Sequence, residues 1–429
     1  PNHVARQYKS TTKPEGVEDL GENDDTTKNF NANNNFYYCN GLPFAPSFSL
    51  YSEATDTTYF EQPAKATGND RFDNAPNKDD WYETIKLNYG VDYCNPCGER
   101  TEHFNPIPST WKKMTDILLF WARKGVDGFR CDMAEMVPSA FWTYAIKEVK
   151  NEFPYILFIG EVYNPSLYDT YIQSGFDYLY DKVGMYDCVR GVIAGTRKPT
   201  EITKQWQATD HIKNKMLYFL ENHDEQRIAS PFFANDAEKG FPGVVVSSLL
   251  LPNPFMLYAG QELGEPGMDA EGFSGRDGRT TIFDYWGIDK LYRGYYKKNA
   301  LTAQEKVIWD KYNAILRIAS KEKVVSVGSF FDLMYANPLT SNFNSNSLYA
   351  FIRAYKQEVL LVVANFSDLE MQCTINIPRH AFEHLSLSEG QVNAVDLLTG
   401  ETTFQMFSPE KPFKVGIDPY GARVYKFTL

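Results

Sequence analysis

Between residues 109 and 321 the sequence alternates short apolar runs with amphipathic segments, and this alternation constrains the fold more than any other feature. The runs are largely unbroken by polar residues, which indicates strands buried on both faces. Helix-forming sequence between successive strands is typical of parallel crossover connections. The segment therefore predicts a parallel sheet covered by helices on both faces, with strands at Val126–Cys131, Tyr155–Ile159, Phe176–Tyr180, Met216–Leu220 and Phe255–Tyr258.

Helix start and stop signals fit this pattern. Ser109 or Thr110 is expected to cap a helix that ends near Lys124, Pro138 opens a second helix, and a third closes the segment near Ser320. Each strand is thus followed by helix-forming sequence, as a parallel sheet requires.

The sequence on either side of this segment has a different character. Residues 5–108 show little periodicity, and Asn23–Asn40 alone holds seven asparagines. A structureless loop of this length would be unusual inside a compact domain, so we expect a small, loop-rich inserted subdomain. Beyond residue 321 short strands separated by turns predict an antiparallel β domain. Its expected strands are Val324–Phe331, Ser347–Tyr355, Val359–Asn365, Cys373–Ile377 and Ala422–Leu429.

Composition argues against several classes of function. The 43 Lys and Arg residues against 55 Asp and Glu give a net charge of −12, which would repel a phosphate backbone, so no nucleic-acid partner is expected. No apolar stretch approaches the roughly 18 to 20 residues needed to cross a bilayer, so no transmembrane segment is expected. Cys94 and Cys97 form the only close cysteine pair, for which a local disulfide or idle thiols are favoured over redox chemistry or zinc binding.

The most informative residues follow the apolar strands. Arg130 and Asp132 end the first strand two positions apart, so both point to the same face. Glu161 follows the second strand, and His223 and Asp224 follow the fourth. A single strand-end acid often does no more than cap the next helix. Three acids with an arginine and a histidine at the same topological position instead indicate a catalytic rim of the kind found in (β/α)8 barrels.

Two carboxylates in different environments are suited to cleaving a glycosidic bond, one ionised as nucleophile or base and one protonated as acid. Arg130 would keep Asp132 ionised, because a neighbouring cation favours the charged form of a carboxyl group. Glu161 follows an apolar run and is the better candidate for the protonated acid.

At these positions the sequence resembles the α-amylase family of glycoside hydrolases, glycoside hydrolase family 13. The resemblance implies that Asp132 is the nucleophile of a covalent glycosyl-enzyme, Glu161 the general acid/base, and Asp224 the residue that holds the hydroxyls of the distorted sugar. It also implies that His3, Arg130 and His223 line the same subsite. The matching segments, in the order of the family, are Pro1-Asn2-His3, Gly128-Phe-Arg-Cys-Asp132, Gly160-Glu161-Val162, Glu221-Asn-His-Asp224 and Tyr258-Ala-Gly-Gln-Glu262.

The resemblance completes the expected α/β architecture as a (β/α)8 TIM barrel with an inserted subdomain and a C-terminal antiparallel β-sandwich. Residues 1–4 would end barrel strand 3, 5–108 form the insert, 109–321 supply barrel strands 4 to 8, and 322–429 form the β domain. Strands 1 to 3 are then largely missing from the sequence, and we expect it to be part of a longer polypeptide. A secreted, periplasmic or cell-surface location is favoured.

Two positions depart from the family pattern and affect the metal expectation. Many family members carry Lys-His three and four positions after the nucleophile, where this sequence has Glu135 and Met136. The usual calcium geometry is therefore in doubt, although Asn2 matches a calcium ligand of some members. No cofactor is required for the chemistry, and a structural calcium ion near Asn2 is the one metal considered.

Three functions stay open at this point. The first is a retaining hydrolase of α-glucosidic bonds, most simply α-1,4 bonds, in starch, glycogen or maltooligosaccharides. The second is a transglycosylase or glucan isomerase that uses the same acids with a sugar acceptor, and the third is a non-catalytic glycan-binding protein. All three acids are present, which disfavours the third. Trp81 and Tyr163 are expected to offer ring faces to sugars.

Overall fold

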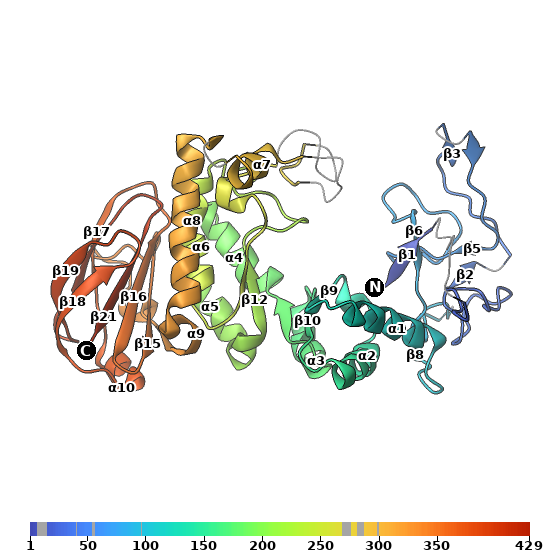
Figure 1. Ribbon diagram of the computed structural model, residues 1–429, viewed down its shortest axis with the longest axis horizontal. Coiled ribbons are helices and arrows are strands. Elements are labelled where there is room, and N and C mark those ends of the chain that lie inside the picture. Colours follow the sequence, from blue (N-terminus) through green and yellow to red (C-terminus); the bar gives the residue numbers. More distant parts are fainter. Residues whose placement is uncertain are drawn as a thin grey trace. The chain divides into compact units, whose positions relative to one another are not determined.

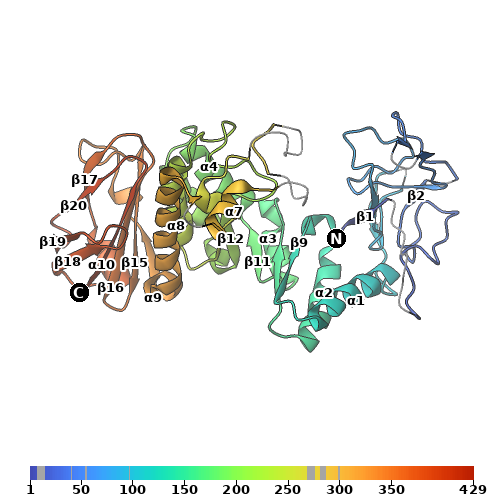
Figure 2. The same cartoon turned by 45° about the horizontal axis from the view of Figure 1, so that its top comes forward.

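The computed structural model describes residues 1–6, 15–39, 41–53, 56–95, 97–267, 276–280, 287–297 and 300–429. The chain divides into two compact units, Pro1–Leu179 and Tyr180–Leu429, and each is described by itself below (Figures 1 and 2). Within the described residues, no helix is both long enough and apolar enough to cross a membrane.

The first part of the N-terminal unit is built from short antiparallel strand pairs joined by turns (blue in Figure 1). Asn and Asp side chains organise these turns. Asn34 and Asn35, for example, are buried and bind backbone groups around Asp25 and Gly21. The strands are β1 (His3–Ala5), β2 (Tyr38–Cys39), β3 (Tyr51–Ser52), β4 (Thr57–Thr58), β5 (Ala64–Lys65), β6 (Thr84–Lys86), β7 (Val91–Asp92) and β8 (Thr101–Glu102).

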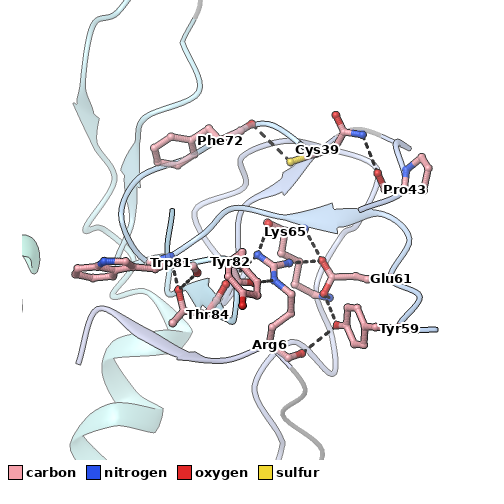
Figure 3. Close-up of polar contacts among 12 residues, drawn as sticks. Arg6, Cys39, Pro43, Tyr59, Glu61, Lys65, Phe72, Trp81, Tyr82 and Thr84 are labelled. Carbon is pink, nitrogen blue, oxygen red and sulfur yellow. Dashed lines mark hydrogen bonds and ion pairs between the residues drawn. The ribbon is translucent and has the colours of Figure 1, made fainter. Parts of the chain in front are cut away.

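A buried arginine ties several of these strands together (Figure 3). Arg6 donates to Glu61 Oε1 at 2.6 Å and to the carbonyl oxygens of Tyr82 and Thr84 at 2.6 and 2.8 Å. Its guanidinium lies 4.1 Å from the centre of the Phe44 ring. The insert therefore has a charged hub, which compensates for a small apolar core.

The second part of the N-terminal unit begins the parallel sheet. β9 (Gly128–Cys131) pairs in parallel with β10 (Leu157–Gly160), and β10 pairs with β11 (Tyr178–Tyr180). α1 (Ser109–Arg123) and α2 (Ser139–Glu152) pack against each other beside these strands, and α3 (Tyr168–Gln173) connects β10 to β11 (Figure 1). Short 3₁₀ turns, η1 (Ala134–Met136) and η2 (Pro165–Leu167), follow β9 and β10.

The expected start of α1 is confirmed, but its expected cap is not. The helix begins at Ser109 after Pro108, and no side chain caps it. Ser109 Oγ and Thr110 Oγ1 instead accept hydrogen bonds from the amide of Asn35 at 2.9 and 3.0 Å. The two hydroxyls are therefore used to attach the insert to the helix.

The C-terminal unit contains two parallel strands that pair with each other, β12 (Met216–Phe219) and β13 (Phe255–Met256). The apolar run before β13 forms the buried helix α6 (Phe241–Leu249), and the long helix α8 (Ala303–Lys321) packs against it (Figure 1). Its other helices are α4 (Asp187–Ile193), α5 (Thr200–Ala208), α7 (Asp289–Tyr295) and α9 (Lys323–Val327), with a π-helical segment η3 (Lys182–Tyr186) and 3₁₀ turns η4 (Asp210–Lys215), η5 (Ala237–Gly240), η6 (Gln261–Leu263) and η8 (Met334–Ala336).

The end of the chain forms antiparallel sheets (red in Figures 1 and 2). The larger sheet has the strand order β14-β15-β16-β21-β18-β19, and β17 pairs with β20 in a second sheet. Phe413 on β20 lies 5.5 Å from the Tyr425 ring and 6.3 Å from the Phe427 ring on β21, which joins the two sheets. The bounds are β14 (Ser329–Asp332), β15 (Leu348–Tyr355), β16 (Glu358–Asn365), β17 (Met371–Ile375), α10 (Arg379–Leu385), β18 (Gly390–Asp396), β19 (Thr402–Phe407), β20 (Phe413–Ile417) and β21 (Ala422–Thr428).

The strand expected at Val324–Phe331 is wrong in its first half, which is the helix α9. The β-branched valines favour a strand, but Arg353 on β15 donates to the carbonyl oxygens of Val325 and Gly328 at 2.7 and 2.8 Å. A Cβ at Gly328 would lie 2.2 Å from the Val324 carbonyl oxygen, so only glycine fits this tight turn. Tertiary contacts therefore override the local propensity.

Candidate active site

Asp132 and Glu161 follow neighbouring parallel strands of the N-terminal unit. β9 and β10 are in register, with Cys131 opposite Gly160, so the next residue of each strand is one of the two acids. The Glu161 amide donates to the Cys131 carbonyl oxygen at 3.1 Å, which extends the pairing beyond the strands. The structure thus brings these two predicted site residues to the same edge of the sheet.

The two carboxylates differ in exposure. The Asp132 side chain is 45% exposed and the Glu161 side chain only 4% exposed. A ligand can therefore reach Asp132 directly, whereas the Glu161 carboxylate is buried.

One guanidinium contacts both acids. Arg130 Nη1 donates to Asp132 Oδ1 at 2.7 Å, and its Nη2 lies 2.8 Å from Glu161 Oε1. The expected pairing of Arg130 with Asp132 is present. Although Glu161 follows an apolar run, Arg130 and two hydrogen-bond donors surround its carboxylate.

The two donors to Glu161 come from residues close in sequence to the acids. The Tyr163 hydroxyl donates to Oε1 at 2.9 Å, and the Met133 backbone N–H donates to Oε2 at 2.8 Å. Met133 has φ of 45°, a left-handed conformation that is unfavourable for a side chain other than glycine. This strained turn directs the N–H after Asp132 toward the carboxylate of Glu161.

Glu135 is a site residue whose role could not be derived from sequence. Its carboxylate accepts from the backbone N–H groups of Tyr163 and Asn164 at 3.2 and 3.0 Å. The residue that replaces the family's usual lysine therefore fixes the loop after Glu161. Its place three residues after Asp132 is the only signal in the sequence for this contact.

His3 lies near Asp132, and Trp81 lies beside His3 in the same unit. Their ring centres are 5.5 Å apart, and the Trp81 side chain is 37% exposed. Burial lowers the pKa of the His3 imidazole from its ordinary value, and the negative charge of Asp132 opposes this shift. The structure therefore places His3 within reach of the charge of Asp132 and the Trp81 ring beside His3.

The contacts of Asn2 do not fit a calcium ion. Its amide donates to the Gly68 carbonyl oxygen at 2.8 Å and lies 3.5 Å from Met136 Sδ, while its Oδ1 is 2.7 Å from His3 Nδ1. Calcium requires six to eight oxygen ligands, and here the amide oxygen is engaged by an imidazole beside a thioether. The described residues also hold no group of three His, Cys, Asp or Glu that could bind a metal. The expectation of a metal ligand at Asn2 is therefore not supported.

The six cysteines, all of which the structure describes, are free thiols. Cys94 and Cys97 lie in a turn ordered by Asp92 and Asn95, whose side chains accept from the cysteine amides at 2.7 and 2.9 Å. The pair therefore stands as two thiols in this structure, one of the two forms expected.

The C-terminal unit holds the other two predicted residues. His223 Nε2 lies 3.1 Å from Asp224 Oδ2, and both residues lie in the loop after β12. Buried Asn222 accepts from the backbone N–H groups of Asp224 and Glu225 at 2.9 and 3.0 Å. This places His223 beside Asp224 at the carboxyl end of its strand. Asp132 and Glu161 belong to the other unit.

A buried ion pair anchors this loop. Arg227 donates to Glu221 Oε2 at 2.9 Å and to the Ala259 carbonyl oxygen at 3.0 Å, and it lies 4.0 Å from the Tyr258 ring centre. Burial raises the pKa of Glu221, and the charge of Arg227 opposes that shift. The loop after β12 is therefore fixed to the loop after β13.

Parallel strands that carry acidic side chains at their carboxyl ends define a catalytic (β/α)-barrel domain. Residues 105–309 match the family model described as "Alpha amylase, catalytic domain". This segment of the chain is therefore similar to the catalytic domain of the alpha-amylase family.

Several curated proteins and solved structures are similar to this chain. Neopullulanase 2 of Thermoactinomyces vulgaris is 22% identical over 325 residues, which are 75% of this chain and 48% of that protein. Alpha-amylase 3 of Dictyoglomus thermophilum is 24% identical and covers 63% of this chain and 56% of its own length. An alpha-1,4-glucan:maltose-1-phosphate maltosyltransferase of Cereibacter sphaeroides is 37% identical over only 57 residues. These are 13% of this chain and 10% of the length of that protein.

Neopullulanase 2 and alpha-amylase 3 each match more than half of this chain. The chain in turn spans about half the length of each of these two relatives. Among solved structures, the alpha-amylase of Geobacillus thermoleovorans has a TM-score of 0.58 at 17% identity, covering 90% of this chain and 72% of that one. The maltogenic alpha-amylase AmyB of Thermotoga neapolitana has a TM-score of 0.56 at 19% identity, with 81% and 68% covered. These structures support the α-amylase fold.

Proposed function

We propose that the chain carries the reaction centre of a retaining glycoside hydrolase that cleaves α-glucosidic bonds, most simply the α-1,4 bonds of starch, glycogen or maltooligosaccharides. The observation that carries the proposal is the pair Asp132 and Glu161 at the ends of adjacent strands, both in contact with Arg130. Retaining enzymes need one carboxylate that attacks and one that moves a proton, and their different exposure suits these two roles.

In the proposed first step, Asp132 attacks the anomeric carbon, and the bond from that carbon to the leaving oxygen breaks. Glu161 supplies the proton that the leaving oxygen requires. In the second step, water takes the place of the departed sugar and its oxygen attacks the anomeric carbon while one of its protons passes to Glu161. The bond from that carbon to Asp132 breaks. Two inversions at one carbon retain the α configuration. The reaction uses side chains alone and needs no cofactor.

The surrounding residues would assist in definite ways. Arg130 would orient the Asp132 carboxylate, because its guanidinium donates directly to Oδ1. His3 and Trp81 would contact the sugar that reacts with Asp132. Asp224, with His223, is proposed to bind hydroxyl groups of that sugar. The last role rests on the family resemblance and the position after β12.

Transfer to a sugar acceptor is the second candidate, and the match to a maltosyltransferase favours keeping it. The same covalent intermediate serves both reactions, and only the second-step acceptor differs. Incubation with a single maltooligosaccharide separates them. Shorter products with new reducing ends support hydrolysis, whereas products longer than the substrate support transfer.

The configuration of the first product tests the retaining mechanism. NMR spectra recorded before mutarotation should show the α anomer at the newly formed reducing end. A β anomer would indicate inversion and would contradict the assignment of Asp132 as nucleophile.

The variant Glu161→Gln should stop cleavage of unactivated glucans but spare a substrate with a good leaving group, because only the former needs a proton donor. Equal loss on both substrates would contradict the acid role.

A further inference from the structure

A cavity lies in the C-terminal unit, away from the strand end that carries His223 and Asp224. Its volume is about 610 Å³, within the range of small-molecule sites. It lies between α5 with η4 on one side and β14 with α10 on the other, and Figure 1 labels α5 and α10. η4 leads into the start of β12, whereas His223 and Asp224 follow its end. The cavity is therefore at the opposite end of that strand.

Aromatic side chains line the cavity. Trp206 is half-buried, and its ring lies 5.0 Å from Phe330 in an edge-on arrangement of 79°. Tyr335 is 62% exposed at the mouth, with its ring 6.1 Å from that of buried Phe331. Such an arrangement offers ring faces and edges to a ligand that has apolar patches of its own.

The Trp206 ring is held in a fixed orientation. Its indole N–H donates to Asp332 Oδ2 at 2.8 Å, and Asp332 is buried. That carboxylate also accepts from Thr203 Oγ1 at 2.6 Å and from the Tyr349 hydroxyl at 2.8 Å. The single polar atom of the indole is thus satisfied by the protein. What remains available is a rigid apolar face, which costs little conformational entropy to use.

The mouth of the cavity carries polar side chains of mixed character. They are the exposed residues Gln207, Asp210, Asn214, His380 and His384, together with half-buried Lys213. Lys213 donates to Asp210 at 2.8 Å, so the neighbouring cation and anion largely offset each other. Amide and imidazole groups around a charge-balanced mouth suit hydroxyl groups better than a phosphate or a carboxylate.

Fixed ring faces surrounded by amide, imidazole and carboxylate groups are complementary to a carbohydrate, whose rings present C–H faces and hydroxyl edges. We propose that this cavity binds an α-glucan chain at a site separate from the reaction centre. The carbohydrate class follows from the chemistry of the lining, and the restriction to α-glucans rests on the proposed function. Such a site would keep the protein on a polymeric substrate between cleavage events.

The test compares retention on insoluble starch granules with hydrolysis of p-nitrophenyl α-maltoside. Trp206→Ala and Tyr335→Ala each remove one ring, and Tyr155→Ala, at a residue 92% exposed in the other unit, is the matched control. We expect each cavity variant to weaken starch binding about fivefold or more, the lower end of what one stacked ring contributes. Trp206→Phe should recover part of the loss. Maltoside turnover should stay within about twofold in every variant.

The outcomes separate this inference from the proposed function. The inference would be overturned if both cavity variants kept wild-type starch retention and normal maltoside turnover. It would also be overturned if the wild-type protein cleaved the maltoside but did not bind starch granules. A wild-type protein that cleaves no α-glucoside would contradict the proposed function, while starch retention would still report on the cavity. Because Tyr335 is exposed at the mouth of the cavity, Tyr335→Ala decides the question if Trp206→Ala does not fold.

Discussion

The hydroxyl of Tyr163 donates to Glu161 Oε1 over 2.9 Å, so this tyrosine contacts the proposed acid through its polar end. Sequence alone suggested only a ring that stacks on sugars. The contact implies two separable contributions, one from the hydroxyl and one from the ring.

Tyr163→Phe should reveal the hydroxyl contribution. Loss of a hydrogen bond to an ionisable carboxyl should lower kcat by about tenfold to a hundredfold, while the affinity for maltooligosaccharides stays the same. Tyr163→Ala should also weaken oligosaccharide binding, by about 1 to 3 kcal/mol if the ring stacks on a sugar. Steady-state kinetics and calorimetry check the two parts. A Phe variant with wild-type kcat would show that the hydrogen bond does not matter for the reaction.

Glu135 should matter through the loop that it holds. Glu135→Ala leaves the Tyr163 and Asn164 backbone N–H groups without their carboxylate acceptor, at a cost of about 1 to 3 kcal/mol. Because this loop follows Glu161 directly, we expect kcat to fall about tenfold or more with a smaller change in KM. Glu135→Gln retains an acceptor oxygen and should recover most of the activity. Glu99→Ala, an exposed acid of the same unit, is the control. Equal kinetics for Glu135→Ala and the control would contradict this role.

Asp181 should make stability depend on pH. Burial raises its pKa from 3.8 to about 6. Ionisation is therefore harder in the folded state than in the unfolded state, so this group lowers stability as pH rises from about 4 to above 6. Complete ionisation of Asp181 therefore lowers the free energy of unfolding by about 3 kcal/mol.

The side chain of the variant Asp181→Asn cannot ionise at this position. The melting temperature of the variant should therefore increase relative to that of the wild type as pH increases from 4 to 7.5. Asp310→Asn, at an exposed position on α8, should follow the wild type throughout. A constant difference between Asp181→Asn and wild type over this pH range would show that Asp181 does not titrate as described.

The Arg6 hub should be essential for the insert. Arg6→Met leaves Glu61 buried without its partner, which should destabilise this region by about 3 to 5 kcal/mol. Arg71→Met breaks only an exposed pair with Asp73 and should cost at most about 1 kcal/mol. Limited proteolysis should therefore cleave residues 15–95 faster in Arg6→Met alone. Adding Glu61→Leu to Arg6→Met should restore part of the resistance to proteolysis, because it removes the unpaired charge of the carboxylate that Figure 3 shows beside Arg6. Equal cleavage of Arg6→Met and Arg71→Met would contradict the account.

The sequence predicted the parallel strands well because their signal is local. β9, β12 and β13 lie within the expected apolar runs, and β10 extends one residue beyond its run, to Gly160. The helix α9 was missed because its cause is Arg353, a residue 26 positions after Val327 whose burial no local pattern reveals. Burial lowers the pKa of this arginine to about 10, and three backbone carbonyl groups compensate for the loss of water.

The candidate site was only partly predictable for a similar reason. Residue type and strand position were enough to select Asp132, Glu161 and Arg130. They did not show that Arg130 contacts both acids, that Tyr163 uses its hydroxyl, or that Met136 lies against Asn2. These contacts depend on side-chain direction after the strand ends, where the chain leaves regular structure and periodicity no longer applies.

Identification of the covalently modified residue tests the central claim most directly. A 5-fluoro α-glycosyl fluoride, whose intermediate forms faster than it breaks down, should inactivate the enzyme, and mass spectrometry of the digested protein should place one sugar on Asp132. Asp132→Asn should show neither adduct nor turnover. An adduct on Glu161 or on any other residue, or turnover by Asp132→Asn, would contradict the proposed mechanism.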